Sequence, residues 1–188
     1  MARVFFKFRG LLMLPPVVFV LTSTWGEIEA ELLVWGPAGA LFLAGFLLRL
    51  WAQIHLHFRL KVRRALTTTG PYRFTRNPIY IANTLLLLSA ACMSELVWFC
   101  PLMLAYALGV YALVVRHEEA RLRRRYGAAY GEYCRQVPRW LPRLRGPRSP
   151  AVPAWRAFLW PSLRAEAHTL LLLAPFILKD VVADMFGG

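Results

Sequence analysis

The sequence predicts an all-helical, multi-pass integral membrane protein, and three observations support this fold class. Hydrophobic residues make up 58% of the 188 residues, well above the roughly 45–50% that soluble domains contain. The net charge is +13 although only 18% of the residues are charged, and the basic residues lie between long apolar blocks. Basic and acidic loops alternate along the chain, as they do when a chain crosses a bilayer several times. A nucleic-acid-binding protein of this charge would be more polar throughout, so we expect no nucleic-acid partner.

Five apolar segments are expected to form the membrane helices, because a crossing needs about 20 mostly apolar residues. The segments are Gly10 to about Trp25, Leu32 to about Ile54, Ile79 to about Met93, Leu96 to about Val115, and Ala167 to Met185. The first resembles a signal peptide, but no convincing small-residue cleavage site follows it, so we interpret it as a retained helix. Only Ser94 and Glu95 separate the third and fourth segments, which predicts a tight hairpin. Pro175 is expected to kink the fifth.

The loop charges predict the orientation. Basic residues precede the first segment, glutamates follow it, basic residues follow the second, Glu95 follows the third, and an arginine block follows the fourth. Because basic loops stay in the cytoplasm, we expect a cytoplasmic N-terminus, five crossings and a C-terminus outside. Residues 1–188 are expected to form one domain with its polar motifs in residues 67–142. Residues 143–188 are expected to hold an interfacial belt and the last membrane helix. The stretch from Arg139 to Arg164, rich in Pro, Arg and Trp, predicts an irregular belt at the cytoplasmic membrane surface.

The first polar stretch, "GPYRFTRNPIY" at Gly70–Tyr80, leads directly into an apolar run. Gly70 and the proline after it predict a turn. Asn77 is expected to cap the next helix, with Pro78 at its first position. The backbone N–H groups of a helix start attract a carboxylate. The simpler alternative is a capped membrane helix beside a snorkelling Arg76.

The second polar stretch runs from Arg116 to Pro142 and contains two adjacent carboxylates, Glu118 and Glu119. At helical spacing they border a stripe made of Leu122, Tyr126, Ala129 and Tyr133. Carboxylates facing such a stripe would bind a cationic group. The alternative is an amphipathic interfacial helix in which Glu119 pairs with Arg123. Both stretches are expected on the cytoplasmic face, so a zwitterionic ligand such as an amino-acid moiety would satisfy both.

Metal and nucleotide motifs are not found in the sequence. His55 and His57 are two residues apart and would point away from each other on a helix, and His117 lies in the other polar stretch. We therefore expect no metal site. The glycine-rich motifs of dinucleotide-binding and P-loop proteins are missing as well.

Together the two stretches resemble the integral-membrane methyltransferases that include isoprenylcysteine carboxyl methyltransferase and phospholipid N-methyltransferases. The resemblance rests on "GPYRFTRNPIY" and on "EEARLRRRYGAAYGEYCRQVPRWLP" at Glu118–Pro142, and it covers roughly Thr67 to Pro142. It implies S-adenosylmethionine as the cofactor. It also implies a lipophilic acceptor that enters from the bilayer, with membrane lipids around the protein.

The resemblance also implies which residues form the site. Asn77 stands where the family pattern has a histidine, so it would not act as an acid or base near pH 7, and His117 could substitute. Catalytic roles are expected for Arg76, Asn77, Glu118 and Glu119. Cofactor contacts are expected from Tyr72, Arg76, Asn77, Tyr80, His117, Glu118, Glu119, Tyr130, Pro138 and Arg139.

Two alternatives remain open at this point. One is an NADPH-dependent membrane reductase of the sterol-reductase type, although paired carboxylates suit a sulfonium amino acid better than a phosphate-rich nucleotide. The other is a non-enzymatic, lipid-binding membrane scaffold. The acceptor atom is also open, since a carboxylate, amine, thiol or phenol on a lipid-like body would each serve.

Overall fold

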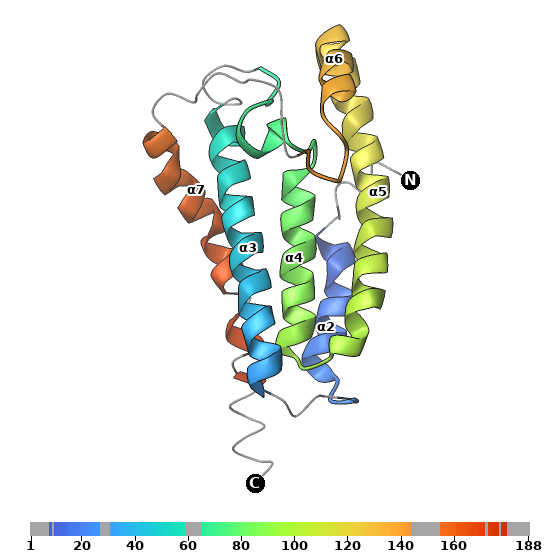
Figure 1. Cartoon of the computed structure of the whole chain (residues 1–188), viewed down its shortest axis with the longest axis vertical. Coiled ribbons are helices and arrows are strands. Elements are labelled where there is room, and N and C mark those ends of the chain that lie inside the picture. The colour runs from blue at the N-terminus through green and yellow to red at the C-terminus, as the bar shows by residue number, and fades with distance from the viewer. Residues whose placement is uncertain are drawn as a thin grey trace.

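The computed structural model describes residues 8, 10–26, 31–58, 65–143, 155–171, 173–176 and 178–179. Within these ranges the regular structure is all helical, which confirms the predicted all-α class (Figure 1). The α-helices are α2 (Leu14–Thr22), α3 (Glu31–Phe58), α4 (Pro78–Met93), α5 (Cys100–Tyr126), α6 (Ala128–Gln136) and α7 (Trp155–Leu170). Short 3₁₀ turns are η1 (Leu11–Met13), η3 (Gly70–Arg73) and η4 (Val97–Phe99).

Helix α4 forms the centre of the bundle. It packs between α3 and α5, α2 also contacts it, and α7 lies against α3 (Figure 1). Helix α6 extends beyond the end of α5, at the same end of the bundle as η3. Helices α4 and α5 each have a proline in their first two positions, where the fixed φ suits a helix and no N–H is lost. The predicted α4–α5 hairpin is confirmed.

Helices α3 and α4 approach each other closely because small residues lie at their contact. A side chain added at Gly45 would meet the Ala82 carbonyl oxygen at 3.0 Å. Ser89 donates its hydroxyl across the same contact to the Ala38 carbonyl oxygen, 2.9 Å away. Small residues and interhelical hydrogen bonds are the usual means by which helices associate in a bilayer.

Two helical stretches are long and apolar enough to cross a membrane, Val34–His57 and Val97–Tyr126. The stretches Leu11–Thr22 and Pro78–Met93 are apolar but shorter. Outward faces of α3 and α5 carry exposed leucines, among them Leu43, Leu47, Leu102, Leu108 and Leu113. Large exposed apolar surfaces of this kind indicate contact with lipid or another apolar partner. The count of five crossings stays a prediction.

The end of the chain differs from its predicted structure. Helix α7 begins at Trp155, inside the segment expected to be an irregular belt, and it ends at Leu170. The expected helix from Ala167 to Met185 is therefore wrong at its start and is interrupted after Leu170. Residues 144–154 of the expected belt and residues 180–188 lie outside the described ranges.

The reason for this error is the reversed polarity of α7. Its buried residues are the polar Ser162, Glu166 and Thr169, while Trp160 and Leu170 are exposed. A search for apolar runs overlooks a helix whose inward face is polar and whose outward face is mixed. Such a face requires polar partners on α3, and Ser162 Oγ indeed lies 3.0 Å from His57 Nδ1.

Candidate functional site

The first polar stretch begins with a turn that only glycine can make. Gly70 has a φ of +59°, in the left-handed region that disfavours side chains. A Cβ at this position would also lie 2.4 Å from the His55 ring on α3. Thr69 Oγ1 contacts His55 Nδ1 at 2.8 Å. The predicted turn is confirmed, and it fixes η3 against the end of α3.

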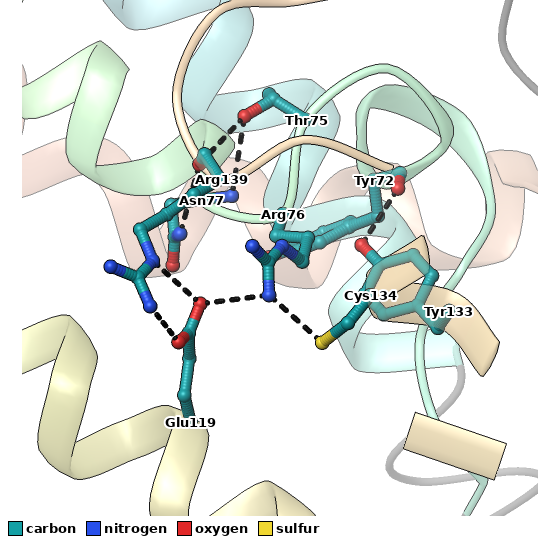
Figure 2. A network of polar contacts seen from close by, with 8 residues as sticks. All are labelled: Tyr72, Thr75, Arg76, Asn77, Glu119, Tyr133, Cys134 and Arg139. Carbon is teal, nitrogen blue, oxygen red and sulfur yellow. Dashed lines mark hydrogen bonds and ion pairs between the residues drawn. The ribbon is translucent and has the colours of Figure 1, made fainter. Parts of the chain in front are cut away.

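Hydrogen bonds to backbone carbonyl oxygens join the two polar stretches. The Arg76 amide donates to the Pro138 carbonyl oxygen at 2.9 Å. The Tyr133 hydroxyl of α6 donates to the Tyr72 carbonyl oxygen at 2.7 Å. Segments that are about 60 residues apart in the sequence are therefore held together at one end of the bundle (Figure 2).

Asn77 occupies the predicted cap position of α4, but its side chain does not cap the helix. Instead, its Nδ2 donates to the Arg139 carbonyl oxygen at 3.0 Å. Thr75 Oγ1 donates to the same carbonyl oxygen at 3.1 Å. The asparagine thus fastens the α4 entrance to the segment that follows α6, and this use of its side chain was not predicted.

Glu119 forms the centre of the polar network (Figure 2). Its carboxylate binds Arg139 through both oxygens, with Nε–Oε1 at 3.0 Å and Nη2–Oε2 at 2.5 Å. Arg76 Nη1 lies 3.0 Å from Oε1 and also donates to Cys134 Sγ. The hydrogen bond to Glu119 raises the pKa of Arg139. The alternative pairing of Glu119 with Arg123 is wrong, because Glu119 is buried and the side chain of Arg123 is exposed.

Glu118 has a different environment from its neighbour. One of its oxygens, Oε2, accepts a hydrogen bond of 2.9 Å from the Tyr80 hydroxyl. Its other oxygen has no hydrogen-bond partner among the described residues. The two adjacent glutamates therefore differ in availability: Glu119 is occupied by two arginines, and Glu118 can accept a ligand.

These groups surround a cavity of about 290 Å³, here called the polar cavity. Its walls come from α3, α4, α5, α6 and the segment before α4. The lining residues are Arg49, Gln53, Leu56, Ala65, Leu66, Thr67, Tyr72, Arg76, Asn77, Pro78, Ile79, Tyr80, Asn83, Glu118, Glu119, Leu122, Tyr126, Tyr130 and Tyr133.

Most of the expected site residues line this cavity, and three do not. His117, Pro138 and Arg139 are not on its wall. Arg139 supports Glu119 from behind, and the Pro138 carbonyl oxygen accepts the Arg76 amide. His117 is half-buried on α5. The cavity is lined by the other seven expected residues, and for these direct ligand contact stays a prediction: Tyr72, Arg76, Asn77, Tyr80, Glu118, Glu119 and Tyr130.

The tyrosine stripe is built differently from the predicted continuous helix. Gly127, with a φ of +53°, ends α5 and starts α6. Ala129 consequently faces outward and Tyr130 takes its place in the buried cluster with Tyr133. Burial raises the pKa of Tyr72, Tyr130 and Tyr133 well above the usual tyrosine value, so these hydroxyls stay protonated and neutral.

A family model described as phospholipid methyltransferase matches residues 37–129. Over these residues the chain is similar to the phospholipid methyltransferase family. The matched residues include α4, α5 and most of α3, and therefore much of the polar cavity's wall. The family match and the two long apolar helices together support a membrane protein.

Two curated relatives in this comparison have names that refer to metal resistance. The nickel-cobalt-cadmium resistance protein NccN of Alcaligenes xylosoxydans xylosoxydans is 33% identical over 123 residues, 65% of this chain and 54% of NccN. The cobalt-zinc-cadmium resistance protein CzcN of Cupriavidus metallidurans is 36% identical over 97 residues, 51% of this chain and 43% of CzcN. The chain thus spans about half the length of these relatives. No solved structure matches the chain.

Sequence reasoning missed several polar residues on or near the polar cavity. Arg49 and Gln53 of α3 and Asn83 of α4 line it, and Glu166 of α7 contacts Arg49. Arg49 is a charged residue inside an apolar segment, which is itself a signal of function in a membrane protein. Glu166 lies outside the residues that the family model matches.

Proposed function

We propose that this protein transfers a methyl group from S-adenosylmethionine to a lipophilic acceptor held in the membrane. The match to the phospholipid methyltransferase family supports the methyl transfer. The observation that supports the cofactor is that one acidic and one basic side chain of the cavity wall each keep an atom without a hydrogen-bond partner among the described residues. S-adenosylmethionine carries a cationic sulfonium, an ammonium and a carboxylate, so both kinds of group have a partner on it.

The acidic group is Glu118, whose second oxygen has no partner within the described chain. A carboxylate on the cavity wall binds an ammonium or lies favourably beside a sulfonium. The basic group is Arg76, whose Nε is buried and has no hydrogen-bond partner in the described ranges. A buried N–H without a partner is costly, and the carboxylate of an amino-acid moiety would satisfy it.

The remaining walls fit the other parts of the cofactor. The first turn of α4 lines the cavity through Pro78, Ile79 and Tyr80. The positive end of the helix dipole there favours the carboxylate of the cofactor's amino-acid moiety. Because Asn77 is engaged with Arg139, its side chain does not occupy this helix end. The flat faces of Tyr126 and Tyr130 provide aromatic surface for an adenine ring.

The protein's own contribution is to position the reacting groups and to exclude water. When bound, S-adenosylmethionine supplies an electrophilic methyl group, which an acceptor lone pair attacks as the carbon–sulfur bond breaks and its electron pair goes to sulfur. In-line alignment of two bound reactants accounts for much of such a rate enhancement. We assign ligand binding to Arg76 and Glu118, and positioning of Arg76 to Glu119. Asn77 does not titrate, so an acceptor proton must leave by another route.

The two alternatives predict different ligands. A reductase would bind NADPH, whose phosphates would meet Glu118 and Glu119 on the cavity wall. A lipid-binding scaffold would bind neither NADPH nor S-adenosylhomocysteine. The family match favours methyl transfer over both.

Calorimetric titration of the purified protein in detergent tests the proposal. S-adenosylhomocysteine should bind and NADPH should not. Glu118→Gln should weaken S-adenosylhomocysteine binding about tenfold or more, the effect of losing a charge-assisted hydrogen bond. Glu132→Gln is the matched control, because Glu132 is an exposed glutamate of α6 outside the cavity. NADPH binding, or equal affinity in both variants and the wild type, would contradict the assignment.

The acceptor can then be sought directly. Protein incubated with labelled S-adenosylmethionine and a membrane lipid extract should label one lipophilic product, and Glu118→Gln should reduce that label. Because two relatives are named metal-resistance proteins, we propose metal resistance as the physiological setting. Growth of a host expressing this chain on nickel, cobalt or cadmium, compared with its Glu118→Gln variant, tests that setting separately.

A further inference from the structure

The polar cavity has a larger neighbour, a cavity of about 500 Å³ here called the apolar cavity. Arg49 and Asn83 line both cavities. Most other walls of the apolar cavity are hydrophobic, among them Met13, Val17, Phe42, Leu86, Met93 and Phe176. A volume of this size is typical of a site for a drug-sized molecule. The two cavities therefore meet at Arg49 and Asn83, with polar walls on one side and apolar walls on the other.

A polar cluster from three helices forms this junction. Arg49 of α3 donates its Nε to Glu166 of α7 and its Nη1 to the Asn83 side-chain oxygen on α4. Thr169 also donates to Glu166, at 3.1 Å. Asn83 is five residues into α4, about 8 Å from the helix start at a rise of 1.5 Å per residue. The cluster thus lies deeper in the bundle than the start of α4, among its apolar residues.

The position of this arginine is difficult to explain by stability alone. A buried ion pair contributes little net stability, because desolvation offsets the attraction between its charges. Charged residues inside membrane segments are rare and usually have a role in binding or transport. Glu166 and Asn83 hold the guanidinium in one orientation, at the point where the two cavities meet.

The guanidinium still has donors to offer. Its Nε and Nη1 are bound, but Nη2 has no hydrogen-bond partner among the described residues. The side chain is 18% exposed, whereas the side chain of Glu166 is fully buried and lines neither cavity. A ligand at the junction therefore meets the cation and not its counter-charge.

We propose that the apolar cavity binds the hydrocarbon body of an amphiphile and that Arg49 binds an oxyanion on its head group. If the proposed function holds, this amphiphile is the methyl acceptor. That role rests on the proposed function, whereas the binding of the amphiphile does not. An ammonium head group would meet the positive charge of Arg49 and bind more weakly. The site thereby selects an anionic amphiphile over a cationic one.

Native mass spectrometry of the detergent-purified protein tests this selection with dodecanoate and dodecylamine, which share a chain and differ in the charge of the head. The wild type should bind dodecanoate about tenfold or more tightly than dodecylamine. The double variant Arg49→Gln, Glu166→Gln removes both charges without leaving a buried one unpaired, and it should lose this preference. Glu166→Gln alone should keep or increase the preference, because it removes only the counter-charge. A purely structural ion pair would leave the preference unchanged in all three proteins.

Arg164→Gln is the matched control, because Arg164 lies on the exposed face of α7 against the Trp160 ring, and it should behave as the wild type. S-adenosylhomocysteine is titrated into the same samples. Selective dodecanoate binding that depends on Arg49, without S-adenosylhomocysteine binding, would support the inference and overturn the proposed cofactor. S-adenosylhomocysteine binding with no head-group preference, or with the same preference in the double variant, would overturn the inference alone.

Discussion

Arg139 binds both carboxylate oxygens of Glu119, although the two residues belong to different segments on either side of α6. Figure 2 shows Arg76 approaching the same carboxylate from the segment before α4. One buried carboxylate therefore joins the end of α5 to the segment before α4 and to the segment after α6. This arrangement makes Glu119 a support for the polar cavity as well as part of its wall.

Replacing Glu119 should destabilise the protein more than replacing an exposed glutamate. Glu119→Gln leaves Arg76 and Arg139 without their shared charge, and breaking a buried ion pair costs about 3 kcal/mol, or about 6–12 °C in Tm for a chain of this size. Glu132→Gln removes the exposed ion pair with Arg135 and keeps an oxygen that can accept from Gln136, so it should cost less than about 1 kcal/mol. Thermal unfolding in detergent measures both, and equal Tm values for the two variants would refute the supporting role.

Asn77→Ala should loosen the α4 entrance without changing the pH dependence of turnover. The variant loses the hydrogen bond from Asn77 Nδ2 to the Arg139 carbonyl oxygen, worth about 1 kcal/mol, and S-adenosylhomocysteine affinity should fall by a few fold. Since asparagine does not titrate, the pH profile of methyl transfer should keep its shape. A shifted pH optimum at normal affinity would show that residue 77 takes part in proton transfer.

Local chemistry made part of the site predictable from the sequence. Gly70 and the following proline specify a turn, and Asn77 followed by Pro78 specifies a helix start, because each depends only on neighbouring backbone geometry. The all-helical class followed from the apolar segments. The meeting of the two polar stretches was expected from loop charges, and the hydrogen bond from the Arg76 amide to Pro138 places them together.

The side chains that pair with Glu119 and that form the tyrosine cluster depend on tertiary contacts and could not be predicted from the sequence. Arg123 lies one helical turn from Glu119 and is the natural partner by spacing, yet the chain reversal after α6 brings Arg139 to the carboxylate. Because α5 ends at Gly127, Tyr130 packs in the tyrosine cluster where the periodic pattern predicted Ala129. Such choices are determined by how distant segments pack, which a periodic pattern does not encode.

Tyr72→Phe should reduce the loss of stability at alkaline pH. Burial raises the pKa of Tyr72 above that of the unfolded chain, which is about 10. Below that pH both states keep the proton and stability is unaffected; above it the unfolded chain loses the proton while the folded protein retains it, so stability falls. One such group costs about 1.4 kcal/mol at one pH unit above 10. Tm measured from about pH 9 to 11 should fall less steeply for the variant, and parallel curves would contradict this account.

The two ends of α5 should lie on opposite sides of the membrane. Glu95 precedes the apolar stretch Val97–Tyr126 and Arg124 lies near its end; at 1.5 Å per residue the intervening helix is about 40 Å long, enough to cross the roughly 30 Å hydrocarbon core. In a background with Cys92, Cys100 and Cys134 replaced by serine, a membrane-impermeant maleimide added to intact cells should label Glu95→Cys. It should label Arg124→Cys only in inverted vesicles, because basic residues stay in the cytoplasm.

The same reagent locates the polar cavity relative to the bilayer. Arg64, which lies outside the described residues, belongs to the basic loop before the first polar stretch, and Arg64→Cys should react from the same side as Arg124→Cys. Agreement would place the α4 entrance and α6 on the cytoplasmic face, where S-adenosylmethionine is available. Labelling of Arg64→Cys and Arg124→Cys from opposite sides would separate the two polar stretches across the membrane and exclude a common site. Labelling of Glu95→Cys and Arg124→Cys from one side would show that α5 does not cross, and the acceptor could then not enter beside it from the bilayer.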